Sequence, residues 1–196
     1  MEAVTQLSYS VDTLYFLLCG VLVMFMAPGF AMLESGLVRS KNTSEILTKN
    51  VALFSIASLM YLVCGYSIMY SDGSGWIPGF GTALWMTDNS VEDVLASNGD
   101  IYYSGASDFF FQVVFVATAM SIISGAVAER MKLFAFLAFA IVMTGFIYPV
   151  QGFWKWGGGA LDELGFLDFA GSGVVHMCGA AAALAGVILL GPRLGK

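Results

Sequence analysis

The sequence predicts an all-α integral membrane protein with five transmembrane helices, its N-terminus outside the cell and its C-terminus in the cytoplasm. Hydrophobic residues make up 58% of the chain and charged residues only 11%, far below the roughly 25% charged residues of soluble domains. Five apolar stretches are each long enough to cross a hydrocarbon core of about 30 Å. Buried helices of a large soluble protein would require a polar surface that this chain lacks.

The five spans are expected at about residues 12–38, 45–70, 107–128, 131–154 and 169–192, all within one domain, 1–196. The first stretch is read as a true span because residues 1–11 are acidic or neutral, unlike the basic start of a signal peptide. Seven of the eight Lys and Arg residues follow the first, third or fifth span, and such segments face the cytoplasm by the positive-inside rule. They are Arg39, Lys41, Lys49, Arg130, Lys132, Arg193 and Lys196.

Most acidic residues fall on the opposite, external side, and the net charge is −6. This balance excludes nucleic acid as a natural partner. Two interpretations of the outer acids stay open: they concentrate cations at the outer surface, or the external loops merely avoid basic residues.

The first two spans meet in a polar connection. Glu34, near the inner end of span one, is expected to bond backbone or hydroxyl groups of a neighbouring helix. Asn42 is predicted to cap span two, with Glu45 reaching back to the same turn. Glu45 and Lys49 are four residues apart and are predicted to pair along the helix surface.

The connection over residues 71–107 opens with "DGSGWIPGFG" and predicts an ordered extracellular loop with a short helix. Span three then begins with "DFFFQVVF", in which the amide of Gln112 requires an internal partner, because an unsatisfied amide in lipid costs several kcal/mol. Span four ends at Trp154 and Trp156. Tryptophans here usually anchor a span at the interface, although a tryptophan face also attracts cations.

Span five combines small residues with His176, the single histidine of the chain. Gly179, Ala183 and Gly186 have the spacing of close helix packing, and a pore wall is the alternative interpretation. Asp168 stands at the outer start of the span, where a carboxylate caps helix N–H groups or holds a cation. His176 lies eight residues deeper, about 12 Å at helical rise, so a neutral imidazole is predicted near the middle of the bilayer.

Three segments are similar to the ammonium transporter, methylammonium permease and Rhesus protein family: "GFAMLESGLVRSKNT" (29–43), "SGAVAER" (124–130) and "WGGGALDELGFLDFAGSGVVH" (156–176). The resemblance covers essentially the whole chain. It implies a fold of eleven helices made from two inverted five-helix repeats, assembled as homotrimers with one pore per subunit. This chain resembles the first repeat.

The resemblance also implies roles for individual residues. Trp156 resembles the external recruitment site for ammonium, and Asp168 the aspartate that shapes this site from behind. Phe115 resembles the outer ring of a phenylalanine gate, with Phe111 lining the approach. His176 resembles the first of two histidines that line the pore.

The chain departs from the family pattern because the second repeat is missing, together with the second gate phenylalanine, the second histidine and the serine of the recruitment site. We therefore expect the missing repeat to be supplied by further sequence or by another polypeptide. Lys155 is also unexpected beside a cation site, unless its amine points away from Trp156.

The function implied is transmembrane transport of ammonium or ammonia in the lipid bilayer of the plasma membrane, without enzymatic activity. Ammonium would be recruited outside and deprotonated, because an intact ion meets a large desolvation cost in an apolar pore. The alternative is an ammonium sensor with a downstream cytosolic signalling domain. One His and three scattered Cys do not form a metal site, so neither a metal nor a cofactor is expected.

Overall fold

The structure is a computed structural model that describes residues 2–194. Over that range its regular elements are helices, apart from an isolated antiparallel bridge between Ser74 and Ile77. Five helical units in the described range are long and apolar enough to cross a membrane, which confirms the predicted fold class. These units are Ala3–Leu37, Ser40–Met69, Gly105–Val127, Leu133–Glu163 and Ser172–Leu190.

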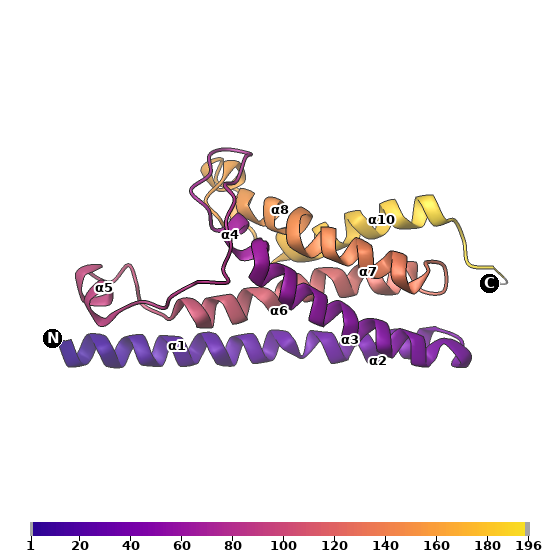
Figure 1. Cartoon of the computed structure of the whole chain (residues 1–196), viewed down its shortest axis with the longest axis horizontal. Helices are drawn as coiled ribbons and strands as arrows, with labels where there is room; N and C mark the ends of the chain where they lie inside the picture. Colours follow the sequence, from indigo (N-terminus) through magenta and orange to yellow (C-terminus); the bar gives the residue numbers. More distant parts are fainter. Residues whose placement is uncertain (1, 195–196) are drawn as a thin grey trace.

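The five units lie along one another in an elongated bundle (Figure 1). Helix α1 (Glu2–Met24) begins at one end of the bundle, and α10 (Cys178–Leu190) finishes at the opposite end. The connections over residues 38–42 and 128–132 lie at the same end as the last turn of α10 (Figure 1). The basic residues of these connections therefore gather at one end, which we assign to the cytoplasm by the positive-inside rule.

The first unit consists of α1 and α2 (Met26–Leu37), which are separated by a single residue, Phe25. Pro28 explains the interruption, because proline has no backbone N–H and its ring clashes with the carbonyl of Met24, four residues earlier. The helix begins at residue 2, earlier than the span start expected near residue 12. The first turns of α1 are polar, so they can be helical outside the membrane. The Ser10 hydroxyl, for example, donates to the Gln6 carbonyl at 2.8 Å.

The second unit runs through α3 (Thr43–Met60), a π-helical turn (Tyr61–Gly65) and α4 (Tyr66–Met69). Two local predictions for its start are wrong. The Asn42 side chain makes no capping bond and instead donates to Glu129 Oε1 at 2.7 Å. Lys49 does not pair with Glu45 along the surface; it is buried, and its Nζ donates to the Ser124 carbonyl at 3.0 Å. In both cases an acceptor distant in the sequence replaces the local partner: Glu129 lies in the connection after α6, and Ser124 lies on α6.

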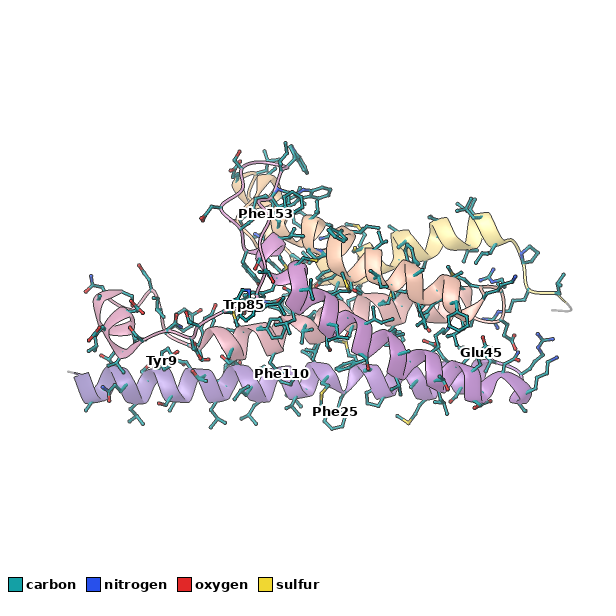
Figure 2. All side chains as sticks on the ribbon, viewed as in Figure 1. Tyr9, Phe25, Glu45, Trp85, Phe110 and Phe153 are labelled. Carbon is teal, nitrogen blue, oxygen red and sulfur yellow. The ribbon has the colours of Figure 1, made fainter. Side chains whose placement is uncertain are left out.

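The outer loop contains the predicted short helix, α5 (Val91–Ala96), which starts with a capping box between Ser90 and Asp93. Tyr9 of α1 points toward this loop (Figure 2), and its hydroxyl accepts a bond from Asn89 Nδ2 at 3.3 Å. The loop is thus attached to the outer end of α1.

Helix α6 (Gly105–Val127) forms the centre of the bundle and contacts α1, α3 and α10. Phe110 fixes its approach to α1 (Figure 2), because a Cβ at Gly20 would lie only 2.7 Å from the Phe110 ring. On the other side, a Cβ at Gly179 of α10 would lie 2.8 Å from the Ala119 carbonyl oxygen of α6. Close packing, one of the two interpretations of the small residues in span five, is therefore confirmed for Gly179.

The fourth unit contains α7 (Leu133–Val142), a π-helical turn (Met143–Ile147), α8 (Tyr148–Lys155) and the short α9 (Ala160–Glu163). The fifth unit opens with a π-helical segment (Ser172–Met177) and continues as α10. π-Turns are rare and occur frequently at functional sites. The last of them contains His176.

Candidate functional site

A line of aromatic rings connects three of the predicted site residues. The ring centroids of Phe111 and Phe115, on successive turns of α6, are 5.1 Å apart. The Phe115 ring lies 5.6 Å from Trp156, which follows α8. Both pairs have the tilted or edge-on geometry that aromatic quadrupoles favour. The structure therefore brings together Phe111, Phe115 and Trp156, although 41 residues separate the last two.

Phe16 of α1 extends this line and was not singled out from the sequence. Its ring is 5.3 Å from Phe111 and stacks on Tyr103 at 3.9 Å. No motif marks Phe16, which stands in a long apolar stretch. Only the packing of α1 on α6 reveals it.

Asp168 caps the start of the fifth unit. Its carboxylate accepts bonds from the backbone N–H of Gly173 at 2.6 Å, the Ser172 hydroxyl at 3.1 Å and the Val174 N–H at 3.4 Å. A carboxylate in this position also interacts favourably with the positive end of the helix dipole. The structural role predicted for Asp168 is thus observed.

Trp156 is placed directly over the same segment. A Cβ added to Gly171 would lie 3.4 Å from the Trp156 ring, and Gly171 has a positive φ of 81°. The Gly171 carbonyl accepts bonds from the N–H groups of Val175 and His176 at 2.8 and 3.0 Å. The tryptophan therefore borders the backbone turn that leads from Asp168 to His176.

The His176 side chain is exposed, and its imidazole has no hydrogen-bond partner among residues 2–194. It does not pack as a satisfied histidine between helices of this chain. Neither ring nitrogen is engaged within the described residues, and a neutral imidazole can donate with one nitrogen and accept with the other.

The charge of Lys155, unexpected beside a cation site, is neutralised. Its ammonium forms a short ion pair with Asp162, on α9. Trp154 is also fixed, because its indole N–H donates to the Trp76 carbonyl at 3.0 Å and its ring meets Trp76 edge to face. Trp156 is thus left as the tryptophan beside the phenylalanine line.

Two buried polar groups near the inner end link separate helices. Glu34, 2% exposed, accepts from the Ser124 hydroxyl of α6 at 2.7 Å and from Asn50 Nδ2 of α3 at 3.2 Å. The predicted bond to a neighbouring hydroxyl is therefore present. Lys49 Nζ lies 4.0 Å from Glu34 and 4.8 Å from the centre of the Phe136 ring.

Gln112 finds an internal partner, as predicted. Its Nε2 donates to Asp108 Oδ1 at 3.4 Å, and the second Asp108 oxygen accepts from the Tyr66 hydroxyl at 2.8 Å. Asp108 was recognised from the sequence only as one of the outer acids. Its burial, with 7% of its surface exposed, appears only in the structure.

A large apolar groove of about 1120 Å³ lies elsewhere, between the fourth unit and α10. Phe139, Val150, Val174 and Ala182 are among its lining residues. Trp156, Phe115 and His176 do not line it, so the groove is separate from the site.

Comparisons with known proteins agree with the resemblance seen in the sequence. The profile of the Ammonium Transporter Family matches residues 14–196. A putative ammonium transporter of Synechocystis is 43% identical over 194 residues, which cover 99% of this chain and 42% of the relative. The ammonium transporter Amt2 of Archaeoglobus fulgidus is also 43% identical, over 95% of this chain and 40% of its own length.

The crystal structure of Mep2 from Candida albicans is similar in fold, with a TM-score of 0.77 and 28% identity. The match covers 92% of this chain and 39% of Mep2. The chain thus spans about two-fifths of the length of the relatives that it matches.

Proposed function

The chain belongs to the ammonium transporter family, and from this premise we propose that it forms the first five-helix repeat of a transporter for ammonium or ammonia. Family membership and five apolar helices make it a multi-pass integral membrane protein. We place that protein in the plasma membrane, as a homotrimer in which a second, inverted repeat completes each pore. Its task is transport rather than enzymatic catalysis.

Recruitment of ammonium is assigned to the outer aromatic line. The face of Trp156 attracts a cation that approaches from outside, and a partly desolvated contact of this kind contributes about 2 kcal/mol. Phe115 stands against Trp156 and separates this position from the interior, while Phe111 borders the approach. Asp168 supports the site from behind, because its bonds hold the backbone on which Trp156 lies.

Deprotonation follows from the cost of desolvating an ion. Ammonium gives up one proton to external water at the outer end, and the desolvation of neutral ammonia then costs only the water hydrogen bonds that it loses. The His176 imidazole offers ammonia a replacement bond inside the passage, since a neutral ring both donates and accepts. A second repeat facing His176 would close the wall of that passage.

The observation that carries this proposal is the contact between Phe115 and Trp156 at 5.6 Å. It joins α6 of the third unit to the residue that follows α8 in the fourth unit, so the proposed cation site and the proposed barrier lie next to each other. The names of the relatives compared above favour transport over the alternative of a sensor.

Uptake of radiolabelled methylammonium into liposomes tests the proposal on the intact protein that contains this chain. Trp156→Leu is expected to raise KM by up to about 30-fold, the equivalent of about 2 kcal/mol. His176→Ala is expected to lower the maximal rate about tenfold, because a hydrogen bond inside the passage is lost.

The matched control is Trp85→Leu, since Trp85 stands on the outer loop with 83% of its surface exposed. It removes a tryptophan on the same side of the membrane and should leave uptake unchanged. Equal uptake by the wild type, Trp156→Leu and His176→Ala would overturn the assignment of both residues.

A further inference from the structure

Asp108 is a buried carboxylate without a basic partner. It is 7% exposed and accepts two hydrogen bonds, from the Tyr66 hydroxyl at 2.8 Å and from Gln112 Nε2 at 3.4 Å. The ion pairs found within residues 2–194 involve Glu34, Glu129 and Asp162, but not Asp108. Buried charges in proteins are paired or coordinate a cation, because desolvation of an isolated ion is very costly.

Gln112 supplies a second, independent sign of a ligand. The residue is 8% exposed, and its Oε1 is buried without a hydrogen-bond partner within the described part of the chain. Its amide group already lies next to the Asp108 carboxylate. A rotation of the amide by 180° would exchange Nε2 and Oε1 and turn the oxygen toward Asp108. Two oxygens facing each other repel, unless a cation lies between them.

Aromatic rings form the wall around these groups. The Tyr66 ring lies 5.1 Å from Tyr70, 5.5 Å from Phe109 and 5.7 Å from Tyr61. The faces of aromatic rings carry partial negative charge and attract cations. The Tyr66 hydroxyl, which donates to Asp108, keeps lone pairs that can accept a further bond.

The negative charge of Asp108 is felt toward the outer loop. Burial, followed by the charge of Asp108, raises the pKa of Tyr103 to about 12. Burial and the same carboxylate also raise the pKa of Tyr70 well above its usual value. Both tyrosines follow or precede a span on the outer side, so the field of Asp108 reaches the side from which a cation arrives.

We propose that Asp108, Gln112 and Tyr66 bind one monovalent cation of ammonium's size, in a site outside the aromatic line. One carboxylate provides a single negative charge, whereas Ca²⁺ takes six to eight oxygen ligands. Ammonium fits because it can donate at once to the carboxylate, the amide oxygen and the tyrosine hydroxyl.

The position of this site on α6 connects it with the proposed function, on which its role in transport rests. Asp108, Gln112 and Phe115 lie on one face of the helix, since they are four and three residues apart. Seven residues at helical rise place Asp108 about 10 Å before Phe115. An ion held at Asp108 is therefore concentrated ahead of the position at Trp156.

Anomalous diffraction from crystals of the intact protein soaked in Tl⁺, a heavy monovalent cation close to ammonium in size, tests binding directly. A peak is expected next to Asp108 in the wild type, reduced by competing ammonium nitrate in chloride-free buffer and absent in Asp108→Asn. Absence of the peak in the wild type, or its persistence in Asp108→Asn, overturns the proposal. Because this measurement does not depend on uptake, it tests cation binding at Asp108 independently of the proposed transport function.

Uptake then tests the role of the site. Asp108→Asn, which keeps an acceptor for Tyr66, is expected to raise the KM for methylammonium about threefold to tenfold without changing the maximal rate. Gln112→Leu should raise KM in the same way if its oxygen binds the ion. Glu92→Gln is the control, because it removes an exposed outer charge on α5 and should leave KM unchanged.

A thermal melt in detergent separates a folding defect from a lost site. A variant with the wild-type melting temperature and a raised KM supports the site. An unchanged KM in both Asp108→Asn and Gln112→Leu overturns its role ahead of Trp156.

Discussion

Glu129 shows how one side chain connects three segments at the inner end of the bundle. Its Oε1 accepts from the Arg39 backbone N–H at 2.9 Å and from the Arg39 guanidinium at 3.0 Å, and its Oε2 lies 3.5 Å from Arg193. Asn42 adds a third donor at 2.7 Å. These bonds hold Glu129 at a positive φ of 61°, which a residue with a long side chain rarely adopts.

The same bonds predict how stability depends on pH. Hydrogen bonds from the Arg39 backbone and Asn42, together with the Arg39 guanidinium, lower the pKa of Glu129 to about 2. A carboxylate with a lowered pKa stabilises the fold above its unfolded value of about 4.3, and this contribution is lost as the pH falls toward 2.

Glu129→Gln is therefore expected to lower the melting temperature of the intact protein in detergent at pH 6. The difference from the wild type should shrink as the pH is lowered from 5 to 2. A difference that stays constant over this range would contradict the role of the carboxylate charge.

At this scale, the sequence predicted residues that belong to motifs and missed those defined by packing. Glu34 and Asp168 make the hydrogen bonds predicted for them, whereas the role of Trp156 rests on the family resemblance and stays a prediction. The partners of Asn42 and Lys49 could not be predicted, since Glu129 and Ser124 are more than 70 residues away in the sequence. Local caps and surface pairs contribute about 1 kcal/mol each, so a carboxylate or a buried carbonyl brought close by the fold can replace them.

Among the helices, the close contact between α6 and α10 depends on the absence of a side chain at Gly179. A Cβ at Gly179 would lie 2.8 Å from the Ala119 carbonyl and 3.1 Å from the Ile122 side chain. Gly179→Ala is thus expected to force the two helices apart and to destabilise the fold by about 1–3 kcal/mol. The loss is measured as a lower melting temperature in detergent.

Gly29→Ala serves as the matched control, because nothing lies within 4 Å of a Cβ at that position in α2. Alanine in a helix is favoured over glycine by roughly 0.5–1 kcal/mol, so this variant should be as stable as the wild type or more stable. A Gly179→Ala protein with the melting temperature of Gly29→Ala would show that the helices have room to adjust.

The five helical units were predictable because their apolar length is set by the bilayer. Their interruptions were not. Three π-helical turns, at Tyr61–Gly65, Met143–Ile147 and Ser172–Met177, leave no mark on hydropathy. They arise where helices meet: the first two lie against each other, and Cys64 Sγ donates to the Gly145 carbonyl at 3.4 Å.

For the molecule as a whole, the orientation in the membrane is a prediction that cysteine labelling tests. Glu92→Cys, on α5, is expected to react with a membrane-impermeant maleimide added to intact cells. Lys132→Cys, in the connection before α7, should react only after the membrane is opened. Little labelling of the native cysteines is expected, since Cys19, Cys64 and Cys178 all lie within spans. Labelling of Lys132→Cys in intact cells would show that the orientation is the reverse of the predicted one.

The proposal of a pore depends on the family resemblance. Hydropathy and charge give spans and orientation, but His176 acquires a role only when a second set of helices faces it. The exposed ring of His176 agrees with a chain that spans about two-fifths of its relatives. The proposed passage needs a second set of helices, and this chain alone does not enclose it.

The inner junction at Glu129 also determines how the folded protein meets the lipid headgroups. Because Glu129 pairs with both Arg39 and Arg193, its negative charge cancels one of the two positive charges that help to orient the chain. Lys41 and Lys132 remain exposed, without an ion pair in the described part of the chain. Each free basic residue contributes about 1 kcal/mol of attraction to anionic lipids. The folded chain should therefore be less sensitive to anionic lipid content than its count of basic residues suggests.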